Sequence, residues 1–325
     1  MTKSLTLQAI DVVGLRKSYG TKVVLDGIDL AVAEGTIFAL LGPNGAGKTT
    51  IVKILSTLIP ADAGDVHVGG HHLDRDPNAV RAAIGVTGQF SAVDDLLTGE
   101  ENLIMMADLY HLDRAEGRRR VADLIETFDL VEAARKPGAT YSGGMRRRLD
   151  LAMTLVGRPR IIFLDEPTAG LDPRSRRTMW KIIRDLVEDG VTIFLTTQYL
   201  EEADQLADRI AVLDHGRLVA EGTATELKRR IPGGHVRLQF ADVAGLDAAA
   251  RALAGSSRDD AALALQVPSD GGVQSLRTLL DRLDAESIVV NELSVNLPDL
   301  DDVFLALTGQ ADEAPRANQE ASNRR

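Results

Sequence analysis

The sequence predicts an α/β fold with a parallel core sheet, followed by a small C-terminal α+β domain. A glycine-rich loop, Gly42 to Thr50, joins the apolar run Ile37 to Leu41 to a helical pattern. A second apolar run, Ile161 to Leu164, ends in two carboxylates. Strand-like and helical patterns alternate after the loop, which is typical of a parallel sheet whose strands are connected by helices.

Short apolar runs bounded by glycine, proline or polar residues predict the individual strands. Expected strands near the loop cover residues 5–13, 23–32 and 66–68. The parallel sheet is expected to contain residues 84–87, 161–164, 191–196 and 210–213. Residues 100–156 carry helical periodicity instead, so we expect a largely helical insertion there.

The glycine-rich loop has the sequence of a phosphate-binding loop. Its glycines allow successive backbone N–H groups to point at one anion, and the helix starting near Lys48 adds the positive end of its dipole. Lys48 is expected to reach the β- and γ-phosphates of ATP, and the Thr49 hydroxyl to ligate Mg²⁺. The predicted nucleotide-binding residues are Gly42, Asn44, Gly45, Ala46, Gly47, Lys48, Thr49 and Thr50.

The second apolar run has a Walker B pattern, in which a buried strand ends in acidic residues. Asp165 would fix Mg²⁺ through water, and Glu166 would point the other way, toward the water that attacks the γ-phosphate. Many classes of nucleoside-triphosphatase share these two motifs, so they do not define the function.

A third segment, Tyr141 to Asp150, distinguishes one of these classes. It reads Tyr-Ser-Gly-Gly-Met-Arg-Arg-Arg-Leu-Asp and resembles the Leu-Ser-Gly-Gly-Gln signature of the ATP-binding cassette (ABC) family. Ser142 can cap a helix and, with Gly143 and Gly144, present a hydroxyl and bare N–H groups to a phosphate. The resemblance implies a P-loop fold of ABC type, with a parallel core sheet, an antiparallel β subdomain and a helical signature subdomain.

The family resemblance also implies an assembly. Ser142, Gly143 and Gly144 would complete the ATP pocket of a second copy of the chain, so that two copies enclose two nucleotides head to tail. Asp172, which follows the Walker B segment, would lie at that dimer interface. An aspartate before Pro173 is equally suited to cap a helix, and both roles are compatible.

Two further positions match the family in register. Tyr19 stands where cassette ATPases place an aromatic ring against adenine, although a tyrosine after a strand often only packs. Gln89 follows the predicted strand 84–87 and matches a loop whose amide contacts Mg²⁺ and which leans on a membrane partner. An isolated glutamine can also be a solvated surface residue.

Gln198 departs from the family pattern. The family places a histidine there, in contact with the γ-phosphate, and an amide cannot carry a proton or a positive charge at ordinary pH. Gln198 can still hydrogen-bond a phosphate oxygen or the attacking water, so Glu166 is the expected general base. The predicted catalytic residues are Lys48, Glu166 and Gln198. A nucleotide sensor that hardly hydrolyses ATP is an alternative, which the intact Asp165–Glu166 pair disfavours.

Gln198 and the signature segment together resemble the daunorubicin-resistance type of ABC ATP-binding subunits in bacterial drug and lipid exporters. The segments Val86 to Gln89, Leu171 to Arg176 and Leu300 to Gly309 extend this match. The resemblance implies ATP hydrolysis that drives efflux through a separate transmembrane permease, at the cytoplasmic face of the membrane. The alternative is a soluble ATPase of this type acting in translation, repair or chromosome organisation. Such proteins show tandem cassettes, a coiled-coil insertion or cysteine zinc sites, and this sequence has none.

Composition agrees with a subunit that leaves the membrane path to another polypeptide. No apolar run approaches the roughly 18 to 20 residues that cross a bilayer, and Met1 to Leu5 lack the apolar core of a signal peptide. The chain has no cysteine, which excludes disulfides and cysteine zinc sites. Its net charge of −11 disfavours nonspecific binding to nucleic acid, so no nucleic-acid partner is expected.

The C-terminal third is expected to form a separate domain. Ile231 to Gly234 would break both helix and strand, which predicts domains at 1–231 and 235–309. Strands are expected at 235–240, 262–267 and 288–295, with helices at 247–254 and 273–283. Residues 300–309 would either help to assemble the transporter or pack on their own domain. The polar residues 310–325 are expected to be a disordered tail.

Two patterns in the helical insertion have alternative interpretations. An apolar stripe could dock a partner helix, but an amphipathic core face explains it slightly better; it consists of Leu103, Met105, Met106, Leu109 and Tyr110. The basic clusters 118–120 and 146–148 are expected to be solvated helix faces, the second only in part.

Overall fold

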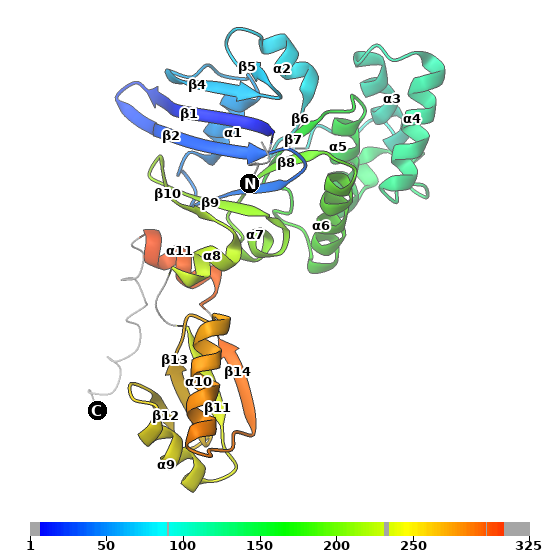
Figure 1. Cartoon of the computed structure of the whole chain (residues 1–325). Coiled ribbons are helices and arrows are strands. Elements are labelled where there is room, and N and C mark those ends of the chain that lie inside the picture. The colour runs from blue at the N-terminus through cyan, green and yellow to red at the C-terminus, as the bar shows by residue number, and fades with distance from the viewer. Residues whose placement is uncertain (1–6, 90, 231–233, 297, 309–325) are drawn as a thin grey trace, which may run out of the picture. The chain divides into compact units, whose positions relative to one another are not determined.

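The computed structural model describes residues 7–89, 91–230, 234–296 and 298–308. The chain divides into two compact units, residues 1–221 and 222–325 (Figure 1). The predicted boundary residues 231–233 and the predicted tail 310–325 lie outside the described residues. The boundary at that point therefore stays a prediction.

One layer of the first unit is a sheet with strand order β2-β1-β4-β5. Its strands are β1 (Gln8–Tyr19), β2 (Lys22–Ala33), β4 (Ala63–Val68) and β5 (His71–His72). The first strand was predicted to end at Val13, but β1 continues to Tyr19. The reason is that Gly14, with φ of 64°, lies at a shift in the β1–β2 register and forms a bulge instead of ending the strand.

The central layer is a six-stranded sheet with order β10-β9-β3-β8-β7-β6. Its strands are β3 (Ile37–Leu41), β6 (Ile84–Thr87), β7 (Ile161–Asp165), β8 (Thr192–Thr197), β9 (Arg209–Asp214) and β10 (Arg217–Gly222). The pairs β3–β8, β3–β9, β7–β8 and β6–β7 are parallel, which confirms the predicted core. All residues of β3, β7 and β8 are buried, as expected for parallel strands covered on both faces.

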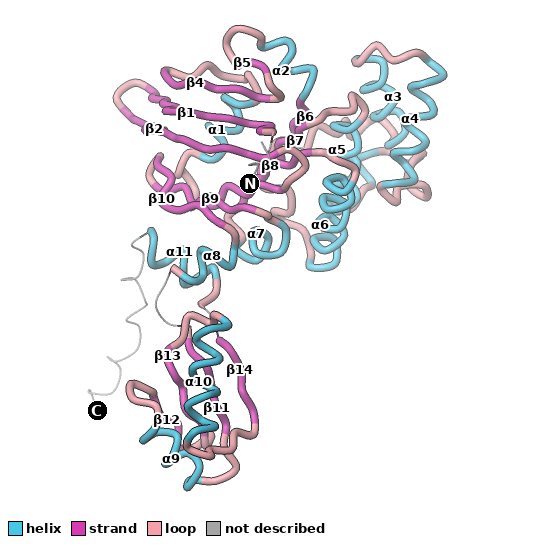
Figure 2. Tube along the Cα trace, viewed as in Figure 1, coloured by secondary structure: helices cyan, strands magenta, loops and turns pink. Residues whose placement is uncertain are grey.

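Helices connect and cover these strands, as Figure 2 shows by colour. They are α1 (Lys48–Leu55), α2 (Pro77–Ala83), α6 (Pro173–Glu188) and α7 (Leu200–Leu206). The core lies where the two sheets and α1 meet, and aromatic rings fill its centre. The Phe194 ring on β8 stacks on Phe38 of β3 at 5.5 Å between centroids and meets Phe163 of β7 at 5.6 Å.

The insertion between β6 and β7 is helical, as predicted. It contains α3 (Gly99–Leu109), α4 (Arg114–Thr127), a short 3-10 turn (Gly138–Thr140) and α5 (Gly143–Leu155). Thr98 and Glu101 form a capping box at the start of α3. The apolar stripe on α3 is not one core face, because Leu103 is fully buried while Leu109 and Tyr110 are exposed.

The second unit has a four-stranded sheet with order β12-β13-β11-β14 and its own apolar core. Its elements are α8 (Ala224–Arg229), β11 (His235–Gln239), α9 (Val243–Ala252), β12 (Ser257–Asp259), β13 (Ala264–Pro268), α10 (Val273–Ala285), β14 (Glu292–Asn296) and α11 (Leu300–Thr308). β14 starts at Glu292 instead of Ile288, because the Ile288 amide donates to the carbonyl of Leu283 at the end of α10. α11 packs against α8, which precedes the predicted domain 235–309, and buries Val303, so neither predicted role of residues 300–309 is established.

No helix among the described residues is long and apolar enough to span a membrane.

Replacing Phe194 by alanine tests the core between the strands. Its ring is fully buried between Phe38 and Phe163, so the cavity is expected to lower the free energy of unfolding by about 3–5 kcal/mol. Urea unfolding followed by the fluorescence of Trp180, the only tryptophan, reports on the first unit. Phe240→Ala, in the core of the second unit, is the matched control and is expected to leave the Trp180 transition unchanged. An equal shift of the Trp180 unfolding midpoint in both variants would contradict the presence of two separate cores.

Candidate nucleotide-binding and catalytic site

The loop between β3 and α1 has the backbone of an anion-binding loop. Gly45 and Gly47 adopt positive φ of 83° and 115°, which side chains disfavour. At Gly42 a Cβ atom would lie 2.4 Å from the Leu213 carbonyl oxygen, so the loop packs on β9 only with glycine there. The sequence of the loop is therefore dictated by its conformation as well as by its ligand.

Lys48 lies at the first turn of α1, and its side chain folds back over the loop. Its Nζ donates to the carbonyl oxygens of Gly42 at 2.6 Å and Pro43 at 3.2 Å. Burial lowers the pKa of Lys48, while the charges of Glu166 and Asp165 oppose that shift. The ammonium group is thus held by the loop and interacts electrostatically with the acidic pair. Thr49 and Asn44 are exposed beside it, and Thr50 is half-buried.

Asp165 and Glu166 end β7 next to this loop. Asp165 is buried and accepts a hydrogen bond from the Thr196 hydroxyl of β8. Glu166 has φ of 50°, an uncommon conformation for a residue with a side chain, and its N–H donates to the Thr196 carbonyl at 3.1 Å. This left-handed residue follows directly on Asp165, the last residue of the strand.

Gln198 follows β8 and belongs to the same edge of the sheet. Thr197, the last residue of β8, pairs with Leu41, the last residue of β3. Gln198 is exposed, and the next N–H, of Tyr199, donates to the Thr197 hydroxyl at 2.9 Å. The ends of β3, β7 and β8 thus bring together Lys48, Asp165, Glu166 and Gln198.

The signature segment begins α5 as a capped helix. The Ser142 hydroxyl accepts from the Met145 N–H at 3.3 Å, as predicted for an N-cap. Gly143 is exposed, and a Cβ at Gly144 would lie 2.5 Å from the Ser175 hydroxyl, so this glycine permits close packing of α5 on α6. Tyr141, which departs from the family leucine, is buried and donates its hydroxyl to the Ala133 carbonyl at 2.8 Å.

The remaining predicted residues lie around this edge. Asp172 caps α6, accepting from the N–H groups of Arg174 and Ser175 and from the Ser175 hydroxyl, and these bonds lower the pKa of its carboxyl. Gln89 is exposed just after β6. Tyr19 is 51% exposed at the end of β1, so its ring does not pack in the core.

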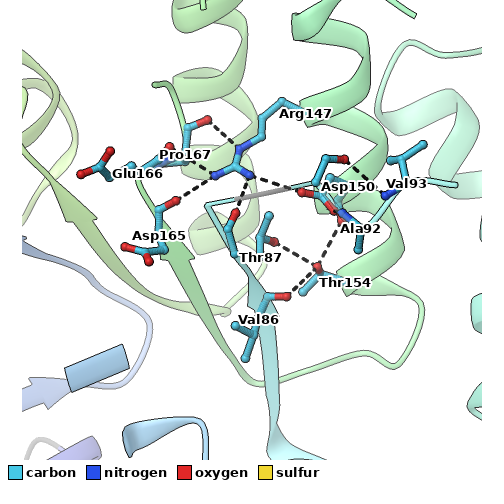
Figure 3. Close-up of polar contacts among 12 residues, drawn as sticks. Val86, Thr87, Ala92, Val93, Arg147, Asp150, Thr154, Asp165, Glu166 and Pro167 are labelled. Carbon is cyan, nitrogen blue, oxygen red and sulfur yellow. Dashed lines mark hydrogen bonds and ion pairs between the residues drawn. The ribbon is translucent and has the colours of Figure 1, made fainter. Parts of the chain in front are cut away.

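Residues 146–148 were predicted to lie on a solvated helix face only in part, and Arg147 is a member of this cluster that is nearly removed from solvent. Figure 3 shows its guanidinium reaching from α5 to the backbone of Asp165, Glu166 and Pro167. Consecutive helical residues point about 100° apart, so three arginines in a row cannot share one solvated face. Asp150, three residues after Arg147, was the available signal for a paired arginine.

Arg120, from the other basic cluster, is also not wholly solvated. It donates to the Leu155 carbonyl at 2.8 Å, and burial lowers its pKa.

Glu202 of α7 is a buried acidic residue that was not predicted from the sequence. It is fully buried, accepts from the Thr168 hydroxyl at 2.7 Å and from the Trp180 ring N–H at 3.2 Å, and burial raises its pKa. It ties the loop after Glu166 to α6 and α7.

The fold and the site together define a nucleoside-triphosphatase of the phosphate-loop class. A family model described as ABC transporter matches residues 25–169. The chain is 48% identical to the daunorubicin resistance ATP-binding protein DrrA3 of Streptomyces coeruleorubidus, over 93% of this chain and 96% of that protein. It is 35% identical to the Nod factor export ATP-binding protein I of Sinorhizobium fredii, over 95% of this chain and 89% of that protein.

A solved structure of the ATP-binding subunit of an ABC transporter is 29% identical and superimposes with a TM-score of 0.62, over 68% of this chain and 92% of that one. The chain belongs to the ABC transporter family and, within it, to the daunorubicin-resistance type of ATP-binding subunit. It is an ABC-type ATPase that binds and hydrolyses ATP. The predicted fold class is confirmed, and the soluble alternative has no support.

Replacing Lys48 by alanine tests the role of the loop. Because a hydrogen bond to a charged group contributes about 1.5–3 kcal/mol, the dissociation constant for ATP is expected to rise about 10- to 100-fold. Titration with a fluorescent ATP analogue measures it. Lys53→Ala is the matched control, since Lys53 is an exposed lysine of the same helix. Unchanged affinity in Lys48→Ala would contradict the assigned role.

Proposed function

We propose that the chain is the ATP-hydrolysing subunit of an exporter and drives a drug, antibiotic or lipid-like substrate through a separate membrane-spanning subunit. The observation that supports this most is the shared sheet edge, where the phosphate loop, the acidic pair and Gln198 meet, in a chain of the daunorubicin-resistance type. The relatives' names include both daunorubicin resistance and Nod factor export, which supports efflux and leaves the substrate open.

The phosphate loop holds the triphosphate of ATP in this proposal. The backbone N–H groups of the loop and the Lys48 ammonium face the phosphate oxygens, and the exposed Tyr19 ring stacks on adenine. Thr49, Asp165 and Gln89 supply oxygen atoms of the kind that Mg²⁺ prefers, and the fixed, buried Asp165 carboxylate fits that role. When bound, the metal ion neutralises charge that develops on the phosphates.

Hydrolysis in this proposal uses Glu166 as the general base. Its carboxylate accepts a proton from a water molecule, whose oxygen forms a bond to the γ-phosphorus while the bond to the ADP oxygen breaks. The Gln198 amide orients that water or a phosphate oxygen, and Lys48 stabilises negative charge on the leaving phosphates. No charged group replaces the family histidine at position 198, so Glu166 alone handles the proton.

Assembly completes the site in this proposal. Ser142, Gly143 and Gly144 of one copy face the ATP bound by a second copy, in a head-to-tail dimer that also uses Asp172. The loop at Gln89, the exposed Leu109 at the end of α3 and the exposed Tyr110 that follows it are suited to contact the membrane subunit. The chain would then act at the cytoplasmic face of the membrane through that partner. We expect no nucleic-acid partner.

A pull-down tests this proposal. Tagged Glu166→Gln chain, incubated with Mg²⁺ and ATP in membranes of the native host, is expected to bind ATP, hydrolyse it slowly and keep its partners. Mass spectrometry should identify a protein with several membrane-spanning helices, and the same complex with unsubstituted chain should hydrolyse ATP. A tagged Lys48→Ala chain controls for ATP dependence. Recovery of ribosomes, DNA or only soluble partners would contradict the exporter.

A further inference from the structure

The Arg147 guanidinium is bound by the backbone that carries the acidic pair. Nη2 donates to the carbonyl oxygens of Asp165 at 3.0 Å and Glu166 at 3.2 Å, and Nε donates to that of Pro167 at 3.0 Å. Nη1 donates to the Gly88 carbonyl at 2.7 Å. One side chain of α5 therefore contacts both the end of β7 and the segment that follows β6.

Asp150 extends this contact to the segment after β6. Its Oδ2 lies 3.3 Å from Nη1 of Arg147, and its Oδ1 accepts from the Ala92 N–H at 3.0 Å (Figure 3). Both side chains are nearly removed from solvent, with 11% of Arg147 and 4% of Asp150 exposed. Burial raises the pKa of Asp150, and the Arg147 charge opposes that shift. The pair thus bridges α5, the segment after β6 and the turn after β7.

Arginine is the side chain that can make these contacts together. Its planar guanidinium has five N–H donors in a fixed fork, whereas a lysine ammonium is a point charge with three donors. Four backbone carbonyls and one carboxylate surround the group, so their negative ends offset the cost of burying its charge.

The neighbouring arginine shows that these contacts do not follow from α5 alone. Arg148 is buried to a similar degree, with 16% of its side chain exposed, but it turns back into the helical insertion. It donates to the carbonyls of Phe128 and Asp129 and pairs with the Asp129 carboxylate. It touches neither β7 nor the segment after β6 in any described contact.

We propose that Arg147 is a positioning residue that holds Glu166 in its left-handed turn and links that turn to the segment after β6 through Gly88 and the Asp150–Ala92 contact. The link rests on the proposed role of Glu166 as the base. A shift of Gly88 and Ala92, on either side of the predicted partner-contacting Gln89, moves a carbonyl that accepts from the Arg147 guanidinium and the N–H that holds Asp150, and therefore the turn at Glu166. A displacement of about 1 Å can change a rate by about 100-fold, so this contact can control hydrolysis.

A double-mutant cycle tests the proposal in the full-length chain bound to its copurified membrane subunit. Single-turnover hydrolysis and ATP affinity are measured for Arg147→Lys, Glu166→Gln and the double variant, with Arg148→Lys as the matched control. Arg147→Lys is expected to lower the hydrolysis rate about 10- to 100-fold with ATP affinity within about twofold. Arg148→Lys is expected to keep the rate within about twofold of the unsubstituted chain.

The double variant decides how Arg147 acts. If Arg147 works through Glu166, adding Arg147→Lys to Glu166→Gln lowers the rate no further, because the positioned group is already lost. Two outcomes would overturn the positioning role of Arg147 and leave the base assignment intact. In the first, the rate reductions of the two single variants multiply in the double variant. In the second, Arg147→Lys hydrolyses ATP at the unsubstituted rate while Glu166→Gln is slow. An unsubstituted rate in Glu166→Gln would instead overturn the base assignment, and the proposal with it.

Hydrogen exchange in the full-length chain gives a readout independent of activity. Arg147→Lys is expected to speed exchange at the N–H groups of Ala92 and Glu166 together, since one side chain tethers both segments. Arg148→Lys is expected to affect only the region around Phe128 and Asp129. Unchanged exchange at Ala92 and Glu166 in Arg147→Lys would contradict the link.

Discussion

The parallel pairing of β3, β8 and β7 is the constraint on which the site depends. Parallel strands end at one edge of the sheet, so the loop after Leu41, the carboxylates after Leu164 and the glutamine after Thr197 come together although they are far apart in the sequence. The strands can hold this register because they are buried on both faces and because Phe38, Phe163 and Phe194 interlock between them.

The site also depends on the helical insertion, because α5 contacts the residues at that edge of the sheet. α5 presents a capped, glycine-bearing N-terminus at Ser142 and, five residues later, buries Arg147 against the turn at Glu166. One short helix thus carries both the segment proposed to face the ATP of a second copy and the side chain proposed to hold the base. Rigid attachment of the two is a physical reason to expect dimer closure and hydrolysis to depend on each other.

Local patterns predicted the parts of the site whose chemistry is local. The glycines of the phosphate loop, the carboxylates that end β7 and the helix caps Ser142 and Asp172 all act within a few residues of their own position. The contacts of Arg147 could not be predicted fully, because its partners are backbone carbonyls from two distant segments. Every residue has a backbone carbonyl, so the sequence does not show which of them accept a hydrogen bond. The length of β1 was missed for a related reason, since Gly14 can either end a strand or form a bulge. The nucleotide and metal roles stay predictions.

A structure of the Glu166→Gln chain determined with Mg²⁺ and ATP tests the central claim most directly. The account predicts the triphosphate against the N–H groups of residues 45–49 and the Lys48 ammonium, with the metal ion near Thr49 and Asp165. It also predicts Ser142 of a second copy facing the γ-phosphate. A nucleotide bound away from the ends of β3 and β7, or one that leaves Lys48 on the carbonyls of Gly42 and Pro43, would contradict it.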